Sequence, residues 1–379
     1  MSTPSPAPSP APSARTGAAG RWGAVLRHHL FWPVLALVVL LAVNTAVRPD
    51  FLSVSILDGH LFGSPIDILR NCAPLMLVAL GMSLVIATRG IDLSVGAVVA
   101  IAGAVALTFI AGSPDPESPT TVLLAVGLAL ALSLALGVWN GFLVSVLGIQ
   151  PIIATLILMT AGRGVAMLVT QGQITTVNSA PFKTLGAGYW FGLPAATLVA
   201  FGVFGLVALL VRRTALGMLV EAVGINPAAS RLAGVQARTI VWTVFALSGL
   251  FSGLAGLILS SNVMAADANN AGLFIELDAI LAVVIGGTSL AGGKFSLSGT
   301  FVGVLIIATL SLTVTNVGIS PLVTPLFKAL VVAAVTLLQS PVVRRRLAER
   351  TRRGGRPPRT APAPRPGKPS DTTTKAVAR

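Results

Sequence analysis

The sequence predicts an all-α integral membrane protein with about ten transmembrane helices. Of its 379 residues, 54% are hydrophobic and only 10% are charged. Each crossing of a hydrocarbon layer about 30 Å thick takes about 20 apolar residues, and a helix satisfies its own backbone hydrogen bonds there. Runs such as residues 123–132 are apolar on every side, whereas the strands of a barrel would alternate apolar and polar residues. The composition therefore favours helical spans over a soluble core.

Ten apolar ranges have the length and hydropathy expected of membrane spans. They are residues 30–47, 72–88, 93–111, 121–139, 151–170, 191–211, 240–260, 277–290, 298–316 and 322–339. The range 277–290 is the shortest, and residues 72–111 form either two helices or one helix broken at its middle. Glycines four residues apart inside a span, such as Gly249 and Gly253, predict close packing between helices of this chain, with a dimer contact as the alternative. The spans define one transmembrane domain, residues 30–340.

The two ends of the chain have compositions that do not form a packed core. Residues 1–29 start with a stretch rich in Ser, Pro and Ala, and residues 341–379 carry most of the net charge of +14 among prolines. Such a basic tail indicates a topology anchor that favours anionic lipid, and not a nucleic-acid surface. Arg21 and Arg27 resemble the start of a signal peptide, but the apolar range that follows is long enough to span, so we expect an uncleaved first helix.

Lysine and arginine near the ends of spans test this count, because they concentrate on the cytoplasmic side. With both termini inside, ten spans place six basic loop residues there: Arg89, Arg212, Arg213, Arg231, Arg238 and Lys294. An odd number of spans would send one basic terminus across the membrane. We therefore expect a multi-pass membrane protein, with both terminal tails disordered and cytoplasmic and the segment 212–239 in the cytoplasm.

Part of this segment has the signals of a helix outside the membrane. Asn226 suits the N-cap, and Pro227 suits the first helical position. Small or apolar residues follow at helical spacing and should form one face, with Ser230 and Arg231 in water. These face residues are Ala228, Ala229, Leu232 and Val235. An ordinary cytoplasmic loop and a docking helix for a soluble partner both fit this pattern.

Polar residues interrupt two other hydrophobic stretches. In residues 81–96, Arg89 and Asp92 lie among glycines, and a carboxylate at bilayer depth costs about 2.5–3.5 kcal/mol on insertion scales. Ser94 could cap a helix beside Asp92, and the segment is either a turn in which Arg89 pairs with Asp92 or a broken helix that lines a pathway. In residues 266–294, amides and carboxylates could bind the hydroxyls of a sugar, although capping of the next helix by Asn270 or Gly272 is the safer interpretation.

Several other kinds of site lack their patterns in this sequence. Walker A requires a glycine six residues before its lysine, but Thr288 holds that position relative to Lys294. One cysteine and three histidines match neither a disulfide nor a metal site. The spans carry Arg163 and Lys328 but no matching acid pair and no catalytic set. We therefore expect no catalytic residues, no metal and no bound cofactor.

Five motifs, in order, resemble the permease subunit of ribose-type sugar ABC importers. They are Gly90–Gly96, Trp139–Gly141, Ile149–Leu156, Glu221–Pro227 and Val284–Gly293. The resemblance runs from about residue 30 to 340, and residues 58–69 and 266–278 are most similar to galactofuranose permeases. Where the family usually has a second glycine before Gly90, this chain has Arg89.

The resemblance implies an ABC importer permease fold in the bacterial cytoplasmic membrane, which pairs with a second permease, identical or homologous. Two cytoplasmic ATPase domains would bind ATP and Mg²⁺, and an extracytoplasmic binding protein would deliver a monosaccharide, either a pentose or a hexose, with galactofuranose as one candidate. The coupling helix would contribute Glu221, Ala222, Gly224, Asn226, Pro227, Arg231 and Gly234. The candidate translocation path is Asp92, Ser94, Asn140, Asn269, Asn270, Glu276, Asp278, Thr288 and Ser289. The alternative function is secondary transport of a small polar solute driven by an ion gradient.

Overall fold

The computed structural model describes residues 30–57, 59–318, 320 and 323–339, and these residues are mostly helical. The predictions for the two tails lie outside the described residues. The longer helices are α2 (Phe31–Val47), α3 (Ser64–Ala87), α4 (Val95–Ala111), α5 (Pro119–Ser145), α6 (Pro151–Val169), α8 (Ala195–Arg213), α11 (Ala237–Val263), α13 (Leu297–Asn316) and α14 (Thr324–Gln339). The shorter ones are η1 (Pro49–Leu52), α7 (Ala180–Gly186), α9 (Leu216–Ile225), α10 (Pro227–Leu232) and α12 (Ile275–Ile285).

Six helices among the described residues are long and apolar enough to cross a membrane, namely α3, α5, α6, α8, α11 and α13. α2 and α4 are apolar helices of 17 residues each, at the lower limit for a crossing. These helices and α14 lie at the predicted ranges. α3 begins earlier than predicted, at Ser64, because Pro65 suits its first turn and the polar residues that follow continue the helix.

The predicted span 277–290 is wrong in length. α12 has 11 residues, which reach about 16 Å at 1.5 Å per residue, roughly half of a hydrocarbon layer. The helix ends at Ile285, and its C-cap is Gly286, where an added Cβ would lie 2.3 Å from the carbonyl carbon of Gly299 in α13. Gly287 then has a φ of 89°, in the region that favours glycine. The Gly287 N–H donates to the Val284 carbonyl at 2.9 Å and the Thr288 N–H to the Val283 carbonyl at 3.2 Å. These are the hydrogen bonds of a glycine C-cap, which ends the helix early.

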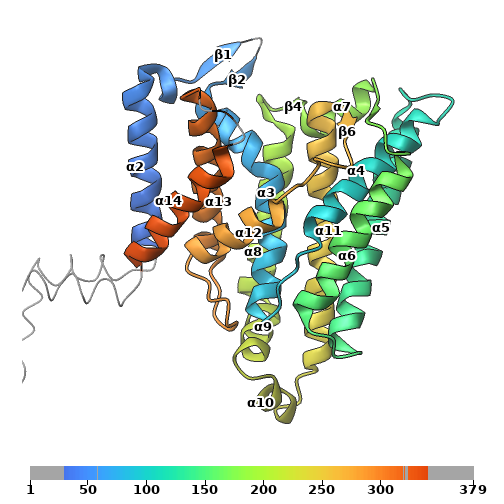
Figure 1. Cartoon of the computed structure of the whole chain (residues 1–379), viewed down its shortest axis with the longest axis vertical. Coiled ribbons are helices and arrows are strands. Elements are labelled where there is room, and N and C mark those ends of the chain that lie inside the picture. The colour runs from blue at the N-terminus through green and yellow to red at the C-terminus, as the bar shows by residue number, and fades with distance from the viewer. Residues whose placement is uncertain (1–29, 58, 319, 321–322, 340–379) are drawn as a thin grey trace, which may run out of the picture. The chain divides into compact units, whose positions relative to one another are not determined.

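Residues 72–111 form two helices, α3 and α4, which meet at a break between Thr88 and Ser94. Every residue of α3 from Cys72 to Ala87 is buried. α3 packs against α8, α11, α12 and α13, and Figure 1 shows it among these helices. A helix that is apolar on all sides fits this central place.

Small residues bring α11 close to α5 and α4. An added Cβ on Gly249 would lie 2.7 Å from Cα of Gly137 in α5, and one on Gly256 would lie 2.3 Å from the carbonyl oxygen of Val99 in α4. Small residues permit such approaches in lipid, where no hydrophobic force presses helices together. The predicted packing role of the α11 glycines within the chain is confirmed.

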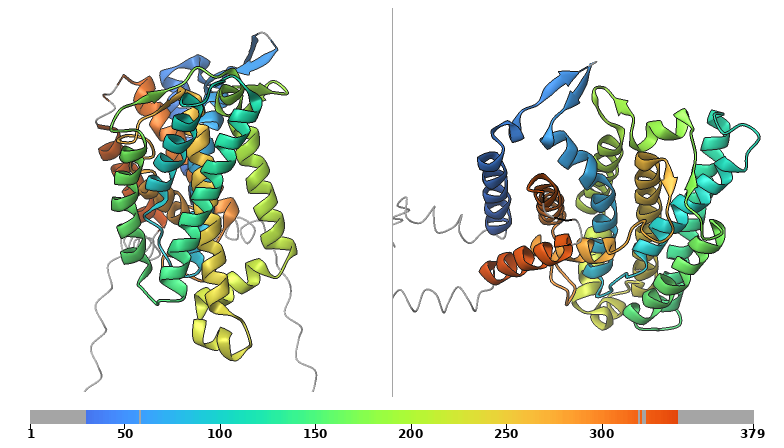
Figure 2. Two further views of the ribbon diagram at one scale, coloured as in Figure 1. Left: turned by 90° about the vertical axis from the view of Figure 1, so that its right-hand side faces the viewer. Right: turned by 45° about the horizontal axis from the view of Figure 1, so that its top comes forward.

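Short antiparallel strands lie at one end of the helices and α9 and α10 at the other (Figures 1 and 2). The strand pairs are β1 (Ser55–Leu57) with β2 (His60–Phe62), β3 (Thr175–Thr176) with β6 (Ala265–Ala266), and β4 (Tyr189–Trp190) with β5 (Leu193–Pro194). The Leu61 N–H donates to the Gly192 carbonyl at 2.9 Å, which joins two of these hairpins. We call the two ends the hairpin end and the α9–α10 end.

Candidate functional site

The predicted helix outside the spans is present as α10, directly after α9. Oδ1 of Asn226 accepts hydrogen bonds from the N–H groups of Ala228 and Ala229, both at 3.1 Å. Pro227 holds the first helical position, where a missing N–H leaves no bond unmade. The predicted N-cap and helix start are confirmed.

The predicted division of α10 into an apolar face and a wet face is wrong. Ser230 is 6% exposed, and its Oγ donates to the Asn226 carbonyl at 3.0 Å, whereas Leu232 is 92% exposed. Arg231 is exposed as predicted. Periodicity shows which residues share a helix face, but the turn at Asn226 decides which face is directed toward the rest of the chain. α10 therefore presents Leu232 and Arg231 outward.

The C-terminus of α9 lies against the break between α3 and α4. Gly224 is buried, and an added Cβ would lie 1.8 Å from the carbonyl oxygen of Ala87 and 2.6 Å from the backbone nitrogen of Gly293. That nitrogen donates to the Ala87 carbonyl at 2.9 Å. Three chain segments meet here backbone to backbone, so position 224 requires glycine. Glu221 and Ala222, one turn earlier, are half-buried.

Asp92 lies in a buried polar cluster that joins the break to two helices. Its Oδ1 accepts from the backbone N–H of Ser94 at 3.0 Å and from the Ser94 Oγ at 2.6 Å, and its Oδ2 accepts from Ser248 of α11 at 2.8 Å. The side-chain amide of Asn140 in α5 donates to the Ser94 Oγ at 2.8 Å. Asp92 is 2% exposed, and its three partners are no more exposed than that. These four residues are the Asp92 cluster.

Arg89 does not pair with Asp92, so the interpretation of residues 81–96 as a turn held by that ion pair is wrong. The Arg89 guanidinium instead donates to the carbonyls of Gly224 and Ile225, the last two residues of α9. Arg89 has a φ of 67°, in the left-handed region that residues other than glycine rarely adopt. The break is therefore also a contact site for α9.

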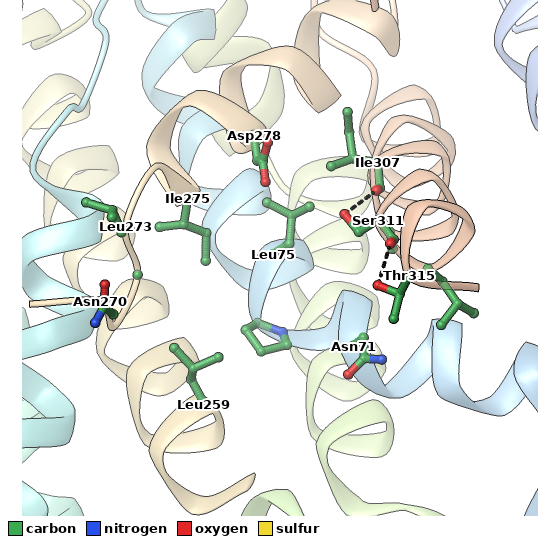
Figure 3. A pocket seen from close by; sticks show the side chains of 14 residues that line it. Asn71, Leu75, Leu259, Asn270, Leu273, Ile275, Asp278, Ile307, Ser311 and Thr315 are labelled. Carbon is green, nitrogen blue, oxygen red and sulfur yellow. Dashed lines mark hydrogen bonds between the residues drawn. The ribbon is translucent and has the colours of Figure 1, made fainter. Parts of the chain in front are cut away.

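A cavity of about 470 Å³ lies among α3, α11, α12, α13 and the loop before α12. Figure 3 shows two predicted path residues, Asn270 and Asp278, on its wall, together with Asn71, Ser311 and Thr315. Most of the remaining wall is apolar. A few polar groups on an apolar wall are typical of sites that bind small polar molecules.

Three polar residues of the cavity wall were not predicted. Ser311 and Thr315 lie four residues apart on α13, so they share a face, and this spacing is a signal that could have identified them. Asn71 was overlooked because the predicted span began at residue 72, whereas α3 begins at Ser64.

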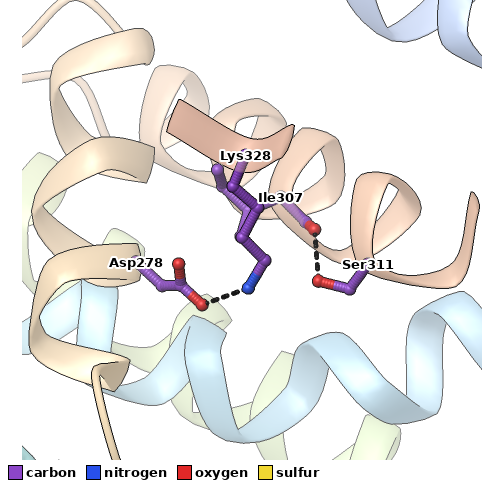
Figure 4. Close-up of polar contacts among 4 residues, drawn as sticks. All are labelled: Asp278, Ile307, Ser311 and Lys328. Carbon is purple, nitrogen blue, oxygen red and sulfur yellow. Dashed lines mark hydrogen bonds and ion pairs between the residues drawn. The ribbon is translucent and has the colours of Figure 1, made fainter. Parts of the chain in front are cut away.

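An ion pair lies beside this cavity (Figure 4). Nζ of Lys328 in α14 is 2.6 Å from Oδ2 of Asp278 in α12, and the two side chains are 17% and 23% exposed. This ion pair was not predicted from the sequence. The two residues are 50 positions apart, and only the tertiary fold brings α14 beside α12.

The other predicted path residues of this region do not line the cavity. Glu276 is 3% exposed and faces α4, where an added Cβ on Gly96 would lie 2.4 Å from its Oε2. Asn269 is exposed. Thr288 is 3% exposed and Ser289 is exposed, and both belong to the glycine-rich loop after α12. Ser94 and Asn140 belong to the Asp92 cluster.

The loop before α12 is held by its own polar groups. Neither Asn270 nor Gly272 caps α12, because the N-cap is Phe274, with a φ of 62° and no side-chain cap. The Asn270 amide donates to Asp267 at 2.7 Å, and this hydrogen bond lowers the pKa of the Asp267 carboxyl. Arg163 in α6 donates to two carbonyls of the same loop at 3.0 and 2.6 Å. The loop is thereby fixed at the cavity.

Long apolar helices, a polar break and a cavity among the spans together define a multi-pass membrane transport protein. The chain belongs to the family described as branched-chain amino acid transport system, permease component, which matches residues 64–339. The galactofuranose transporter permease protein of Escherichia coli K12 is 50% identical over 315 residues, 82% of this chain and 90% of that protein. No solved structure matches the chain.

Two further relatives are also named as sugar permeases. The fructose import permease protein of Bifidobacterium longum is 43% identical over 325 residues, 84% of this chain and 90% of that protein. The ribose import permease protein of Escherichia coli K12 is 37% identical over 311 residues, 81% of this chain and 92% of that protein. The predicted resemblance to sugar ABC permeases is confirmed. A permease component carries no catalytic site of its own, and the family implies an ATPase and a binding protein as partners.

Proposed function

We propose that this chain is the permease subunit of an ATP-driven importer that carries a monosaccharide across the cytoplasmic membrane. The observation that carries the proposal is the 50% identity to a galactofuranose permease over 82% of the chain. Galactofuranose is accordingly the first sugar to test, with fructose and ribose next. ATP and Mg²⁺ would bind a separate ATPase, because the glycine-rich loop after α12 lacks the Walker spacing.

In this proposal the α9–α10 end faces the cytoplasm, and both termini are inside. The basic residues Arg89, Arg212, Arg213 and Arg231 belong to that end, as the positive-inside rule requires. The hairpin end would face outward, toward the sugar-binding protein. A second permease, identical or homologous, would complete the transmembrane pair.

The ATPase would dock on α9 and α10, which contain or adjoin all seven predicted coupling residues. Leu232 and Arg231 extend from α10, and the C-terminus of α9 contacts the break between α3 and α4 through Gly224. A movement imposed on this surface would therefore reach the membrane helices directly.

The sugar would pass through the cavity beside α3, α11, α12 and α13. Asn270 and Asp278 offer an amide and a carboxylate, and Asn71, Ser311 and Thr315 add further donors and acceptors for hydroxyl groups. Apolar side chains around them can contact the faces of a sugar ring. We infer a weakly binding path, with most of the selectivity supplied by the binding protein.

The alternative, a secondary transporter, needs an ionisable residue that exchanges an ion inside the helices. Asp92 accepts three hydrogen bonds, and Asp278 pairs with Lys328. Glu276, whose buried Oε2 has no hydrogen-bond partner among the described residues, is the residue that such a mechanism would use. The ATP-driven function does not require it to titrate.

Reconstitution in liposomes separates the two functions. We expect galactofuranose to accumulate only when the permease is present with its ATPase, its binding protein and ATP. The same permease alone, under an imposed proton or sodium gradient, should move no sugar. Gradient-driven uptake without an ATPase would instead establish the secondary transporter.

The cavity makes a separate prediction about the path. Ser311→Phe should reduce sugar uptake strongly, because a phenyl ring would project from α13 into the cavity of about 470 Å³ and narrow the path. Ser311→Ala is the control for size and should transport far better than Ser311→Phe, because it leaves the cavity open and removes a hydroxyl group whose proton already binds the Ile307 carbonyl of its own helix. Normal uptake by Ser311→Phe, measured with radiolabelled sugar, would exclude this cavity from the path.

A further inference from the structure

The Arg89 side chain caps a helix that lies far from it in the sequence. The last four carbonyls of a helix have no partner within that helix, and a cation there also complements the helix dipole. Arg89 donates from Nε and from a terminal nitrogen to the carbonyls of Gly224 and Ile225. A planar guanidinium can bind two such oxygens at once, which an ammonium group does less well.

The arginine is held tightly in this position. Its backbone N–H donates to the Ile86 carbonyl at 2.9 Å, and the next N–H, of Gly90, donates to the Val85 carbonyl at 2.9 Å. On the other side, an added Cβ at Gly292 would lie 2.4 Å from the Arg89 Cγ. The side chain therefore runs past the glycine-rich loop to reach α9.

The break continues from Arg89 directly into the Asp92 cluster. Three residues after Arg89, the Asp92 carboxyl group binds Ser248 of α11. α11 also contributes Leu259 to the wall of the cavity. A continuous set of contacts thus leads from α9 through Arg89 and the break to a helix of the cavity.

The two contacts between α9 and the break differ in what they can transmit. The close packing of Gly224 against Ala87 resists compression, but it offers no resistance when the segments move apart. The two hydrogen bonds of Arg89 resist separation as well. Transport requires the helices to be moved in both directions.

We propose that Arg89 is a positioning residue that transmits movement of α9 to the Asp92 cluster and through it to the cavity. The proposal rests on the proposed function, in which the ATPase docks on α9 and α10. Arg89 holds the two segments together when the ATPase withdraws, and Gly224 pushes them when the ATPase closes.

Arg89→Gly tests this role without straining the backbone, because glycine adopts a φ of 67° readily. In liposomes with the ATPase, the binding protein and galactofuranose, ATP hydrolysis should stay within about twofold of wild type, while the sugar moved per ATP should fall about tenfold, within the usual range of coupling between sites. Arg89→Lys should recover part of the loss. Gln171→Gly, at an exposed position with a φ of 53° at the hairpin end, should behave as wild type. If Arg89→Gly moves as much sugar per ATP as the wild type, the proposal is overturned.

A second measurement uses the permease alone and does not depend on what it transports. Spin labels are attached to cysteines introduced by Met218→Cys in α9 and Leu147→Cys after α5. Both positions are exposed, and the natural Cys72 is buried. We expect a narrow distance distribution in the labelled wild type and a broader one after Arg89→Gly. If Arg89→Gly broadens the distance distribution but the reconstituted wild type shows no ATP-driven uptake, the positioning role is retained and the proposed function is rejected. An unchanged distribution would reject the positioning role itself.

Discussion

Gly224→Val is expected to abolish ATP-driven sugar uptake. The first atom of any side chain at this position would lie 1.8 Å from the carbonyl oxygen of Ala87 and 2.6 Å from the backbone nitrogen of Gly293. Overpacking of a tight contact costs about 1–3 kcal/mol even where side chains can adjust, and here the neighbours are backbone atoms that cannot rotate away. α9 must therefore move off the break, and uptake and ATPase binding can be measured on the same purified variant.

Gly205→Val in α8 is the matched control. Gly205 is exposed, and an added Cβ would meet no atom within 4 Å, so this variant should insert, bind the ATPase and transport as wild type. Gly224→Val should still insert, because its clash lies at the end of the helices. Wild-type uptake by Gly224→Val would show that the contact between α9 and the break is not needed for coupling.

The features predicted correctly from the sequence depend on local chemistry. Runs of apolar residues gave the long spans, and Asn226 followed by Pro227 gave the start of α10, because caps and helix starts depend on neighbouring residues. The length of α12 was missed because the predicted span ran through Gly286 and Gly287, where a glycine cap ends the helix. The orientation of Ser230 was missed because periodicity does not specify which face is buried.

In the candidate site too, the sequence identified individual residues, whereas their contacts depend on the tertiary fold. Asp92, Ser94 and Asn140 were predicted as residues of one translocation path, and the structure brings them into one buried cluster. Ser248 was not predicted, because serines in helices commonly bond to their own backbone. The pairing of Lys328 with Asp278 likewise depends on the packing of α14 and α12, which no local pattern specifies.

Asp92→Ala is expected to lower the unfolding temperature of the purified permease markedly. The substitution leaves the Ser94 backbone N–H and the Ser94 and Ser248 hydroxyl groups without their acceptor. A buried polar group without a partner costs about 1–3 kcal/mol, so the total loss should reach several kcal/mol. Hydroxyl groups can rotate toward other acceptors, but the Ser94 N–H is fixed by the start of α4. Thermal unfolding in detergent measures the effect.

Two further variants show whether this loss comes from hydrogen bonding or from the change of size. Asp92→Asn keeps a side-chain oxygen for the two Ser94 donors, and the amide NH₂ of the new asparagine can donate to the Ser248 hydroxyl. This variant should therefore unfold at a temperature close to that of the wild type. Asp115→Ala removes an exposed acid at the hairpin end and should have no effect. If Asp92→Ala and Asp115→Ala unfold at the same temperature, the Asp92 cluster does not hold α5 and α11 to the break. Movement of α9 could then reach the cavity only through backbone packing.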